Sequence, residues 1–127
     1  MANTITITAG LTWSDGKNTI KDSGSQSFSQ SDGGNVIFNV QDIGTGAEAI
    51  VLGDVSPGYI LFKNLDTPGT VQAPNNNFII IGNDSGVALV AAKLSAGESV
   101  MIPTDQATWY AKADSAPVQM LVLAMDA

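Results

Sequence analysis

One nine-residue stretch near the middle of the chain, residues 58–66, constrains the fold more than any other. It reads Gly-Tyr-Ile-Leu-Phe-Lys-Asn-Leu-Asp, and turn-forming sequences flank it at residues 56–58 and 66–69. A short, almost continuous apolar run between such breakers predicts a β-strand that is buried on both faces. The rest of the chain must then supply the elements that cover this strand.

Similar short runs recur along the chain at a spacing of about 8–12 residues, which is typical of an all-β sandwich or barrel. Residues 35–41 predict a strand with either a bulge or two covered faces, because Ile37 and Phe38 are adjacent. Residues 87–94 predict a strand, since this Ala- and Leu-containing segment is too short for a stable helix. Further strands are expected at residues 49–52, 78–81, 99–102, 108–113 and 118–125. We therefore expect a single all-β domain of about ten short antiparallel strands.

The first third of the chain carries fewer apolar residues. Residues 3–9 alternate polar residues with Ile and predict a strand, which Gly10 interrupts. Residues 14–17 (Ser-Asp-Gly-Lys) predict a hairpin turn, after which residues 18–22 pair back. Residues 22–34 are the most loop-like segment, in which Phe28 is the one residue suited to burial.

Two main interpretations of residues 1–34 remain open. They form a solvated hairpin or edge strand of the same domain as residues 35–127, or they form an arm that packs on a neighbouring subunit. Disorder agrees less well with the regular alternation of Ile and Thr. Residues 35–127 are expected to form the β-sandwich core.

The composition removes much of the usual chemistry of enzymes. The chain has no Cys, His or Arg, so it offers no thiolate, no imidazole and no bidentate guanidinium. Its net charge of −7, with five lysines, disfavours nucleic acid and anionic membranes as partners. We expect a protein that is not an enzyme and that needs no cofactor or metal.

The N-terminal residues lack the basic and apolar segments of a signal peptide, and no apolar run approaches the roughly 20 residues of a membrane span. We therefore expect a soluble protein made without a removable leader.

Most acidic residues are aspartates beside Gly or Ser, as β-turns require. Residues 32–35 and 83–85 carry too few oxygen ligands for a calcium-binding loop. No pair of carboxylates stands in a pattern that indicates glycosidase chemistry.

The aromatic residues are the remaining candidates for a binding site. Trp13, Trp109 and Tyr110 could form a platform on which a sugar stacks, although core packing or a subunit contact is the simpler interpretation. Trp109 and Tyr110 are expected on opposite faces of their strand. Phe28 joins these three as a candidate interface residue.

Sheet edges are normally protected by Lys, Pro or other charges. Here the long N-terminal strands are polar but nearly uncharged. Such edges are safest when closed in a barrel or paired in an assembly, which favours a structural, oligomeric role.

Four segments, residues 43–54, 57–66, 94–100 and 109–114, resemble in that order a group of small tailed-bacteriophage proteins found among virion structural genes. The resemblance covers about residues 36–125. In that group an Asn-Leu-Asp element is commonly followed by Thr-Asn-Tyr-Val, whereas this chain has Thr-Pro-Gly-Thr-Val at residues 67–71. The resemblance implies a compact, jelly-roll-like β-sandwich built into or onto the particle, and it carries over no catalytic residue.

The resemblance leads us to expect a bacteriophage capsid decoration or cement protein. It would bind the major capsid protein on the virion surface as a homo-oligomer, a trimer because capsids offer three-fold positions, after synthesis in the host cytoplasm. The alternative is a glycan- or receptor-binding module of a phage tail or fibre.

Overall fold

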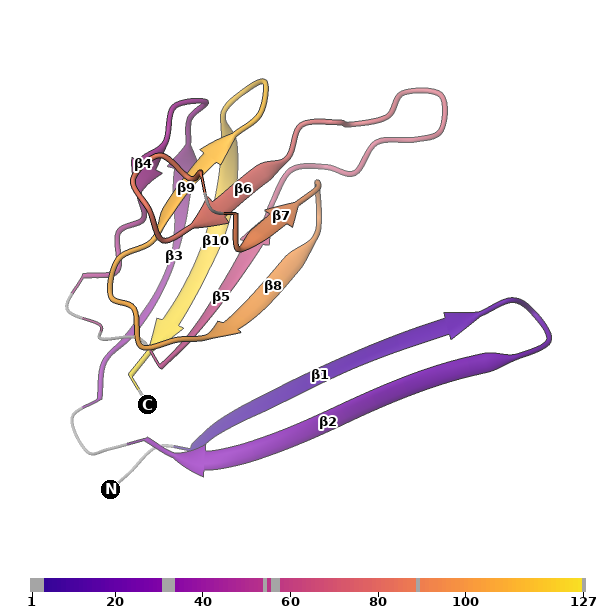
Figure 1. Cartoon of the computed structure of the whole chain (residues 1–127), viewed down its shortest axis with the longest axis horizontal. Helices are drawn as coiled ribbons and strands as arrows, with labels where there is room; N and C mark the ends of the chain where they lie inside the picture. Colours follow the sequence, from indigo (N-terminus) through magenta and orange to yellow (C-terminus); the bar gives the residue numbers. More distant parts are fainter. Residues whose placement is uncertain (1–3, 31–33, 54, 56–57, 89, 127) are drawn as a thin grey trace. The chain divides into compact units, whose positions relative to one another are not determined.

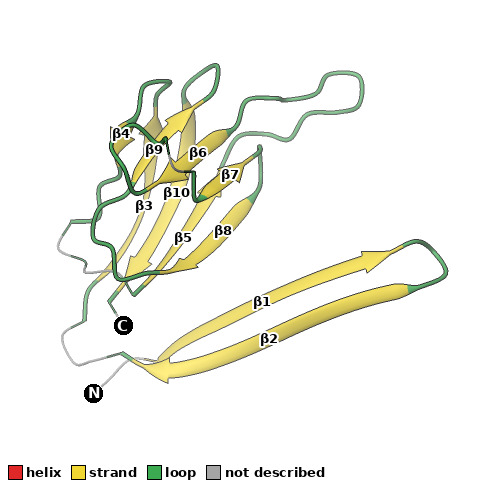
Figure 2. Cartoon of the chain, viewed as in Figure 1, coloured by secondary structure: helices red, strands yellow, loops and turns green. Residues whose placement is uncertain are grey.

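The computed structural model describes residues 4–30, 34–53, 55, 58–88 and 90–126. It divides into two compact units, Met1–Gly33 and Gly34–Ala127. The described residues contain ten strands and no helix, and every strand pair is antiparallel (Figures 1 and 2). The prediction of an all-β protein is confirmed.

The first unit is a two-stranded hairpin of β1 (Thr4–Ser14) and β2 (Thr19–Ser29). Its turn is held by Asp15, whose Oδ1 accepts hydrogen bonds from the backbone N–H groups of Lys17 (2.9 Å) and Asn18 (2.7 Å). Gly16 follows Asp15 with a φ of 89°, a conformation that favours glycine.

One prediction for this hairpin is wrong, because Gly10 does not interrupt the first strand. Residues 22–29, the most loop-like part of the sequence, continue the second strand, in agreement with the hairpin interpretation. The tight turn fixes the register, and Gly10 is then paired opposite Ser23 within the ladder. Hydroxyl groups also pair across the strands, as between Thr6 and Ser27 (3.1 Å).

The second unit contains two four-stranded sheets. The first sheet has the order β3-β10-β5-β8, with β3 (Val36–Ile43), β10 (Val118–Met125), β5 (Tyr59–Asn64) and β8 (Ser99–Pro103). The second has the order β4-β9-β6-β7, with β4 (Glu48–Ala49), β9 (Tyr110–Ala113), β6 (Ile79–Gly82) and β7 (Ala92–Leu94). The pairing is nested, since β3 pairs with β10, β4 with β9, β5 with β8 and β6 with β7.

The core lies between these two sheets. Ile60 and Phe62 of β5 face Ile79 and Ile81 of β6 in one cluster of fully buried side chains. The rings of Phe62 and Trp109 join the two sheets, with centroids 6.1 Å apart and planes at 56°. The second unit is therefore a β-sandwich, with a core to which both sheets contribute.

The central stretch forms β5, an interior strand flanked by β10 and β8. Only one of its faces is fully covered, however. Leu61 and Tyr59 point away from the core and are half-buried, and Lys63 is exposed. The prediction of burial on both faces is wrong for the outer face.

Segment 87–94 also differs from the prediction, because β7 contains only Ala92–Leu94. The preceding turn extends further than expected. Val87 is buried with a φ of 51°, and its N–H donates to the Asp84 carbonyl (3.0 Å). The N–H of Ala88 donates to Asp84 Oδ2 (2.9 Å). Asp84 therefore keeps residues 87 and 88 in a turn, where they do not pair with a neighbouring strand.

Strand β3 contains no bulge, because its register with β10 is unbroken from Val36 to Ile43. Strand β4 is shorter than the predicted 49–52. After β4, the side chain of Gln41 makes the hydrogen bonds to Val51 that a neighbouring strand would otherwise make. Gln41 Nε2 donates to the Val51 carbonyl (2.7 Å), and Gln41 Oε1 accepts from the Val51 N–H (2.9 Å).

Candidate interaction surfaces

The described residues offer surfaces, and not a metal site, as candidates for function. No group of three or more carboxylates among them is placed to hold a metal ion. No helix in this described part is long and apolar enough to cross a membrane. The candidates for function are therefore exposed surfaces.

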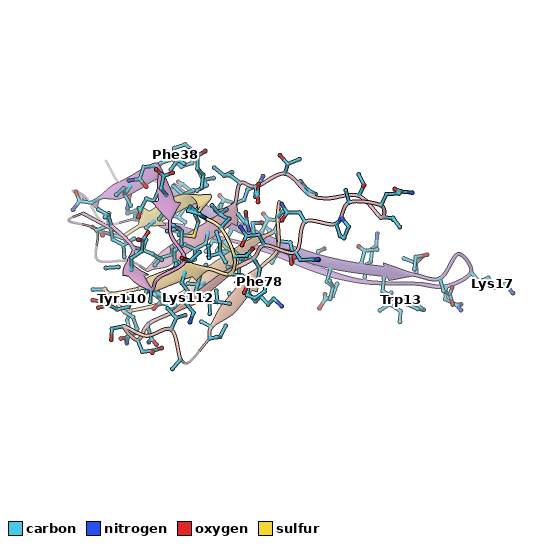
Figure 3. The ribbon with its side chains drawn as sticks, turned by 90° about the horizontal axis from the view of Figure 1, so that it is seen from above. Trp13, Lys17, Phe38, Phe78, Tyr110 and Lys112 are labelled. Atoms are coloured by element: carbon cyan, nitrogen blue, oxygen red, sulfur yellow. The ribbon has the colours of Figure 1, made fainter. Side chains whose placement is uncertain are left out.

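The largest is the outer face of the β3-β10-β5-β8 sheet. The strand registers place nine apolar residues side by side on this face, which we call the apolar sheet face: Val36, Phe38, Val40, Tyr59, Leu61, Met101, Leu121, Leu123 and Met125. The three from β3 are the most exposed, with Val36 at 55%, Phe38 at 66% and Val40 at 50%. Figure 3 shows Phe38 at the surface of the second unit.

This face is apolar because four strands alternate with the same phase. In β10, the even-numbered residues from Val118 to Ala124 are buried, so the odd-numbered Leu121, Leu123 and Met125 face outward. An outward-facing sheet surface normally carries polar residues. Here polar residues gather only at one end of the face, at Asp42, Lys63, Ser99 and Gln119.

The hairpin also has two different faces. Its pairing places Ile5, Ile7, Ala9, Leu11, Trp13 and Ile20 on one side, which we call the apolar hairpin face. The opposite side carries mostly Thr and Ser. Leu11 is 80% exposed, Trp13 53% and Ile20 68%, and Figure 3 shows Trp13 near the turn that carries Lys17. The end of the hairpin near the turn is therefore an unpartnered apolar surface.

A smaller mixed surface lies on the outside of the second sheet. Lys93 Nζ lies 4.1 Å from the ring centroid of Phe78, a cation–π geometry. Ile80 pairs with Lys93 on one side and Lys112 on the other, so the two lysines flank it. Tyr110 follows on the same face of β9 (Figure 3).

The structure places the four predicted site residues in different environments. Trp13 is exposed on the hairpin, and Phe28 lies opposite Ile5 in the ladder, although its side chain is outside the described part. Trp109 is buried at 4% exposure, and its Nε1 donates to the Gln106 carbonyl (3.1 Å). Tyr110 faces the other way, as predicted.

Within the second unit the buried Trp109 therefore does not share a stacking surface with Tyr110. Of the segments considered for calcium, Asp32 lies outside the described residues, and Asp84 uses Oδ2 to hold the turn before β7.

Sequence reasoning missed the apolar sheet face. A signal was present, because residues 36–40 and 121–125 are apolar at nearly every position. Such runs were interpreted as strands covered on both faces, and a single sequence does not say whether the cover comes from the same chain.

Comparison of the chain with protein-family models, with curated proteins and with solved structures finds no match. The surfaces described above are therefore the basis for assigning a function.

Proposed function

We propose that this chain is a capsid decoration, or cement, protein of a tailed bacteriophage. It binds the capsid surface as a homo-oligomer and stabilises the capsid by bridging neighbouring subunits. The observation that carries this proposal is the apolar sheet face, whose exposed part is Val36, Phe38 and Val40.

The size of this face supports an adhesive role. Four strands of up to eight residues span roughly 26 Å by 14 Å, or on the order of 400 Å² when the polar end at Asp42 and Gln119 is included. This is about the size of the largest apolar patch on a typical monomer, roughly 300–600 Å², and such patches are often functional. A surface of this kind, in a chain without His, Cys or Arg, favours binding over catalysis.

The topology adds a second argument. We infer that the sandwich is a jelly roll, because its eight strands pair in a nested order, first with last and innermost together. Jelly rolls recur in viral capsid and lectin domains. This support is an analogy of fold, because one fold hosts many functions, and it agrees with the phage resemblance of residues 36–125.

The mechanism needs no covalent step. A protein that binds the assembled capsid but not its free subunits shifts the equilibrium toward the assembled state. At a free concentration 100-fold above Kd, each bound copy contributes about 2.7 kcal/mol. Repeated over a capsid lattice, such contributions oppose rupture by heat or internal pressure.

The test uses particles of a phage that encodes this chain. Quantitative staining of purified particles should give a copy number comparable to that of the major capsid protein. Particles lacking the protein should release DNA at a lower temperature and recover when the purified chain is added. A few copies per particle, or no effect of re-addition, would contradict decoration.

A glycan-binding module of a tail or fibre is the second candidate. The observation that favours it is the mixed surface of Phe78, Lys93, Lys112 and Tyr110, which presents two half-buried aromatic rings beside two lysines. A glycan array probed with the purified chain tests this. Binding that Tyr110→Ala abolishes would favour the glycan role, and an array without signal would exclude these glycans as ligands.

A further inference from the structure

We propose that the chain assembles by arm exchange: the apolar hairpin face of one copy docks on the apolar sheet face of a second copy. The occupant of the sheet face is thus the β1–β2 hairpin of a neighbour. The inference deepens the proposed function, because it names the contact that forms the oligomer. It rests on the proposed function only for the place where the oligomer acts, the capsid surface.

The hairpin needs a partner for its own stability. A two-stranded hairpin is marginal in water unless a further strand or layer packs on it. Here Leu11, Trp13 and Ile20 expose most of their surface on one face, while the other face carries hydroxyl groups that water satisfies. Ile5, at the other end of this face, is already buried, so the part near the turn is the part available for packing against another sheet.

The sheet face is the matching surface within the same chain. It is also apolar, and its charged residues, Asp42 and Lys63, lie toward one end. The apolar hairpin face carries a single charged residue, Asp22, opposite Leu11 in the ladder. Pairing the two faces buries the most exposed apolar groups of both while burying few charges.

The lengths of the two faces favour a neighbour over the same chain. Eleven-residue strands make the hairpin about 36 Å long, whereas the eight residues of β3 span about 26 Å. If the hairpin folded back from the short connection between Ser29 and Val36, its apolar tip would pass the polar end of the face. A hairpin from another copy is free to place Trp13 and Ile20 over Phe38 and its neighbours.

The buried area is sufficient for a stable assembly. A hairpin about 10 Å wide that overlaps the roughly 26 Å length of β3 covers on the order of 260 Å² on each partner. A closed pair contains two such contacts and buries about 1,000 Å² in total, the size that a specific interface needs. Each further copy in a ring adds one contact of the same kind.

Cross-linking tests the contact directly, because the chain has no cysteine of its own. Leu11→Cys and Phe38→Cys place thiols on the two faces at highly exposed positions. The two full-length single variants are co-expressed with tags of different size, purified together without capsids and treated with a short bis-maleimide. We expect a covalent heterodimer carrying both tags.

Thr12→Cys is the matched control, because Thr12 neighbours Leu11 but lies on the opposite face of the hairpin. Combined with Phe38→Cys, it should give at least five-fold less heterodimer. Circular dichroism confirms that each variant is folded.

Other cross-links would overturn the proposal. Leu11→Cys linked only to itself would mean that hairpins pack on hairpins, and Phe38→Cys linked only to itself would mean that two sheet faces meet. A double variant that links within one chain would mean that the hairpin folds back. A chain that sediments as a monomer at micromolar concentration would also exclude arm exchange, and none of these results depends on whether the chain binds capsids.

Discussion

Asn64 shows how a single buried polar residue holds together three parts of the second unit. Its side chain is fully buried at the end of β5, where Nδ2 donates to the Leu94 carbonyl (3.0 Å) and Oδ1 accepts from the Asp66 N–H (2.9 Å). Its backbone pairs with the turn at Gly97 and Glu98. Both polar atoms of the side-chain amide are thus hydrogen-bonded at a site that water does not reach.

We expect Asn64→Asp to lower the free energy of unfolding by about 2–3 kcal/mol, because it leaves the Leu94 carbonyl without a donor and places an acidic group beside it. Urea denaturation at pH 7 measures the change. Asn76→Ala is the control: Asn76 is exposed, and its replacement should change stability by less than about 0.5 kcal/mol. An Asn64→Asp variant as stable as the wild type would show that the buried network contributes little.

Position 69 requires glycine, because the backbone there lies too close to another backbone segment to leave room for a side chain. It lies in the long loop between β5 and β6 (Figure 1), and a Cβ added to it would lie 2.6 Å from the Ala73 carbonyl oxygen, closer than real contacts allow. The loop is closed by Asn75, whose Nδ2 donates to Asp66 Oδ2 (2.8 Å) and to the Thr67 carbonyl (2.9 Å).

Gly69→Ala should therefore open this loop, shift the backbone amide resonances of residues 66–77 and lower stability by about 1–3 kcal/mol. Gly46→Ala serves as the control, since a Cβ there meets open space. Two-dimensional NMR compares both variants with the wild type. Unchanged resonances in Gly69→Ala would mean that the loop has a different conformation in solution.

At the scale of the element, the hairpin turn depends on the ionisation of Asp15. Hydrogen bonds from the backbone N–H groups of Asn18 and Lys17 lower the pKa of this carboxyl below its usual value of 3.8. Because the pKa is lowered on folding, the carboxylate stabilises the turn at pH values above the pKa of the unfolded chain. This stabilisation is lost as the pH falls through the pKa of the folded chain.

We expect amide exchange from the hairpin, relative to that from the core strands, to accelerate as the pH falls below about 4, after correction for intrinsic rates. Asp15→Asn should weaken the turn and remove this dependence. Asp22→Asn, in the same hairpin but outside the turn, should retain it. A dependence that survives in Asp15→Asn would assign the effect to another group.

The sequence was sufficient for elements whose signals are local. The strand at residues 118–125 and the turn at Asp15 and Gly16 follow from apolar runs, Pro and turn residues. The continuation of β2 through Ser23–Ser29 did not follow, because Ser and Gly are weak strand formers. Pairing with the Thr-rich β1 compensates, and such pairing is not visible in local propensity.

The candidate surfaces were predictable only in part. Period-two alternation in residues 3–9 gave the two faces of the first strand correctly. The start of β7 was predicted too early, because the Asp84 side chain, and not the apolar pattern, decides where residues 87 and 88 lie. The apolar sheet face forms because four strands that are distant in sequence lie side by side with their apolar residues on the same side. Predicting it requires knowing the order of the strands in the sheet.

At the scale of the whole molecule, net charge and apolar surface act in opposite directions on self-association. Each chain carries a net charge of −7, so two copies repel each other at low ionic strength, where the screening length is about 30 Å at 0.01 M salt. The proposed contact is apolar, and salt at 0.5 M screens the repulsion without weakening that contact.

We therefore expect the association constant of the purified chain, measured by sedimentation equilibrium, to rise several-fold between 0.02 and 0.5 M NaCl, because the Debye length shortens over this range. Phe38→Lys and Val71→Lys provide a matched pair, since both change the net charge from −7 to −6 and both positions are exposed. Val71 lies on the loop before β6, away from the apolar sheet face. Phe38→Lys should abolish association, whereas Val71→Lys should leave it unchanged or slightly stronger. An association that weakens with salt, or that both variants weaken equally, would mean that ion pairs and not apolar faces hold the copies together.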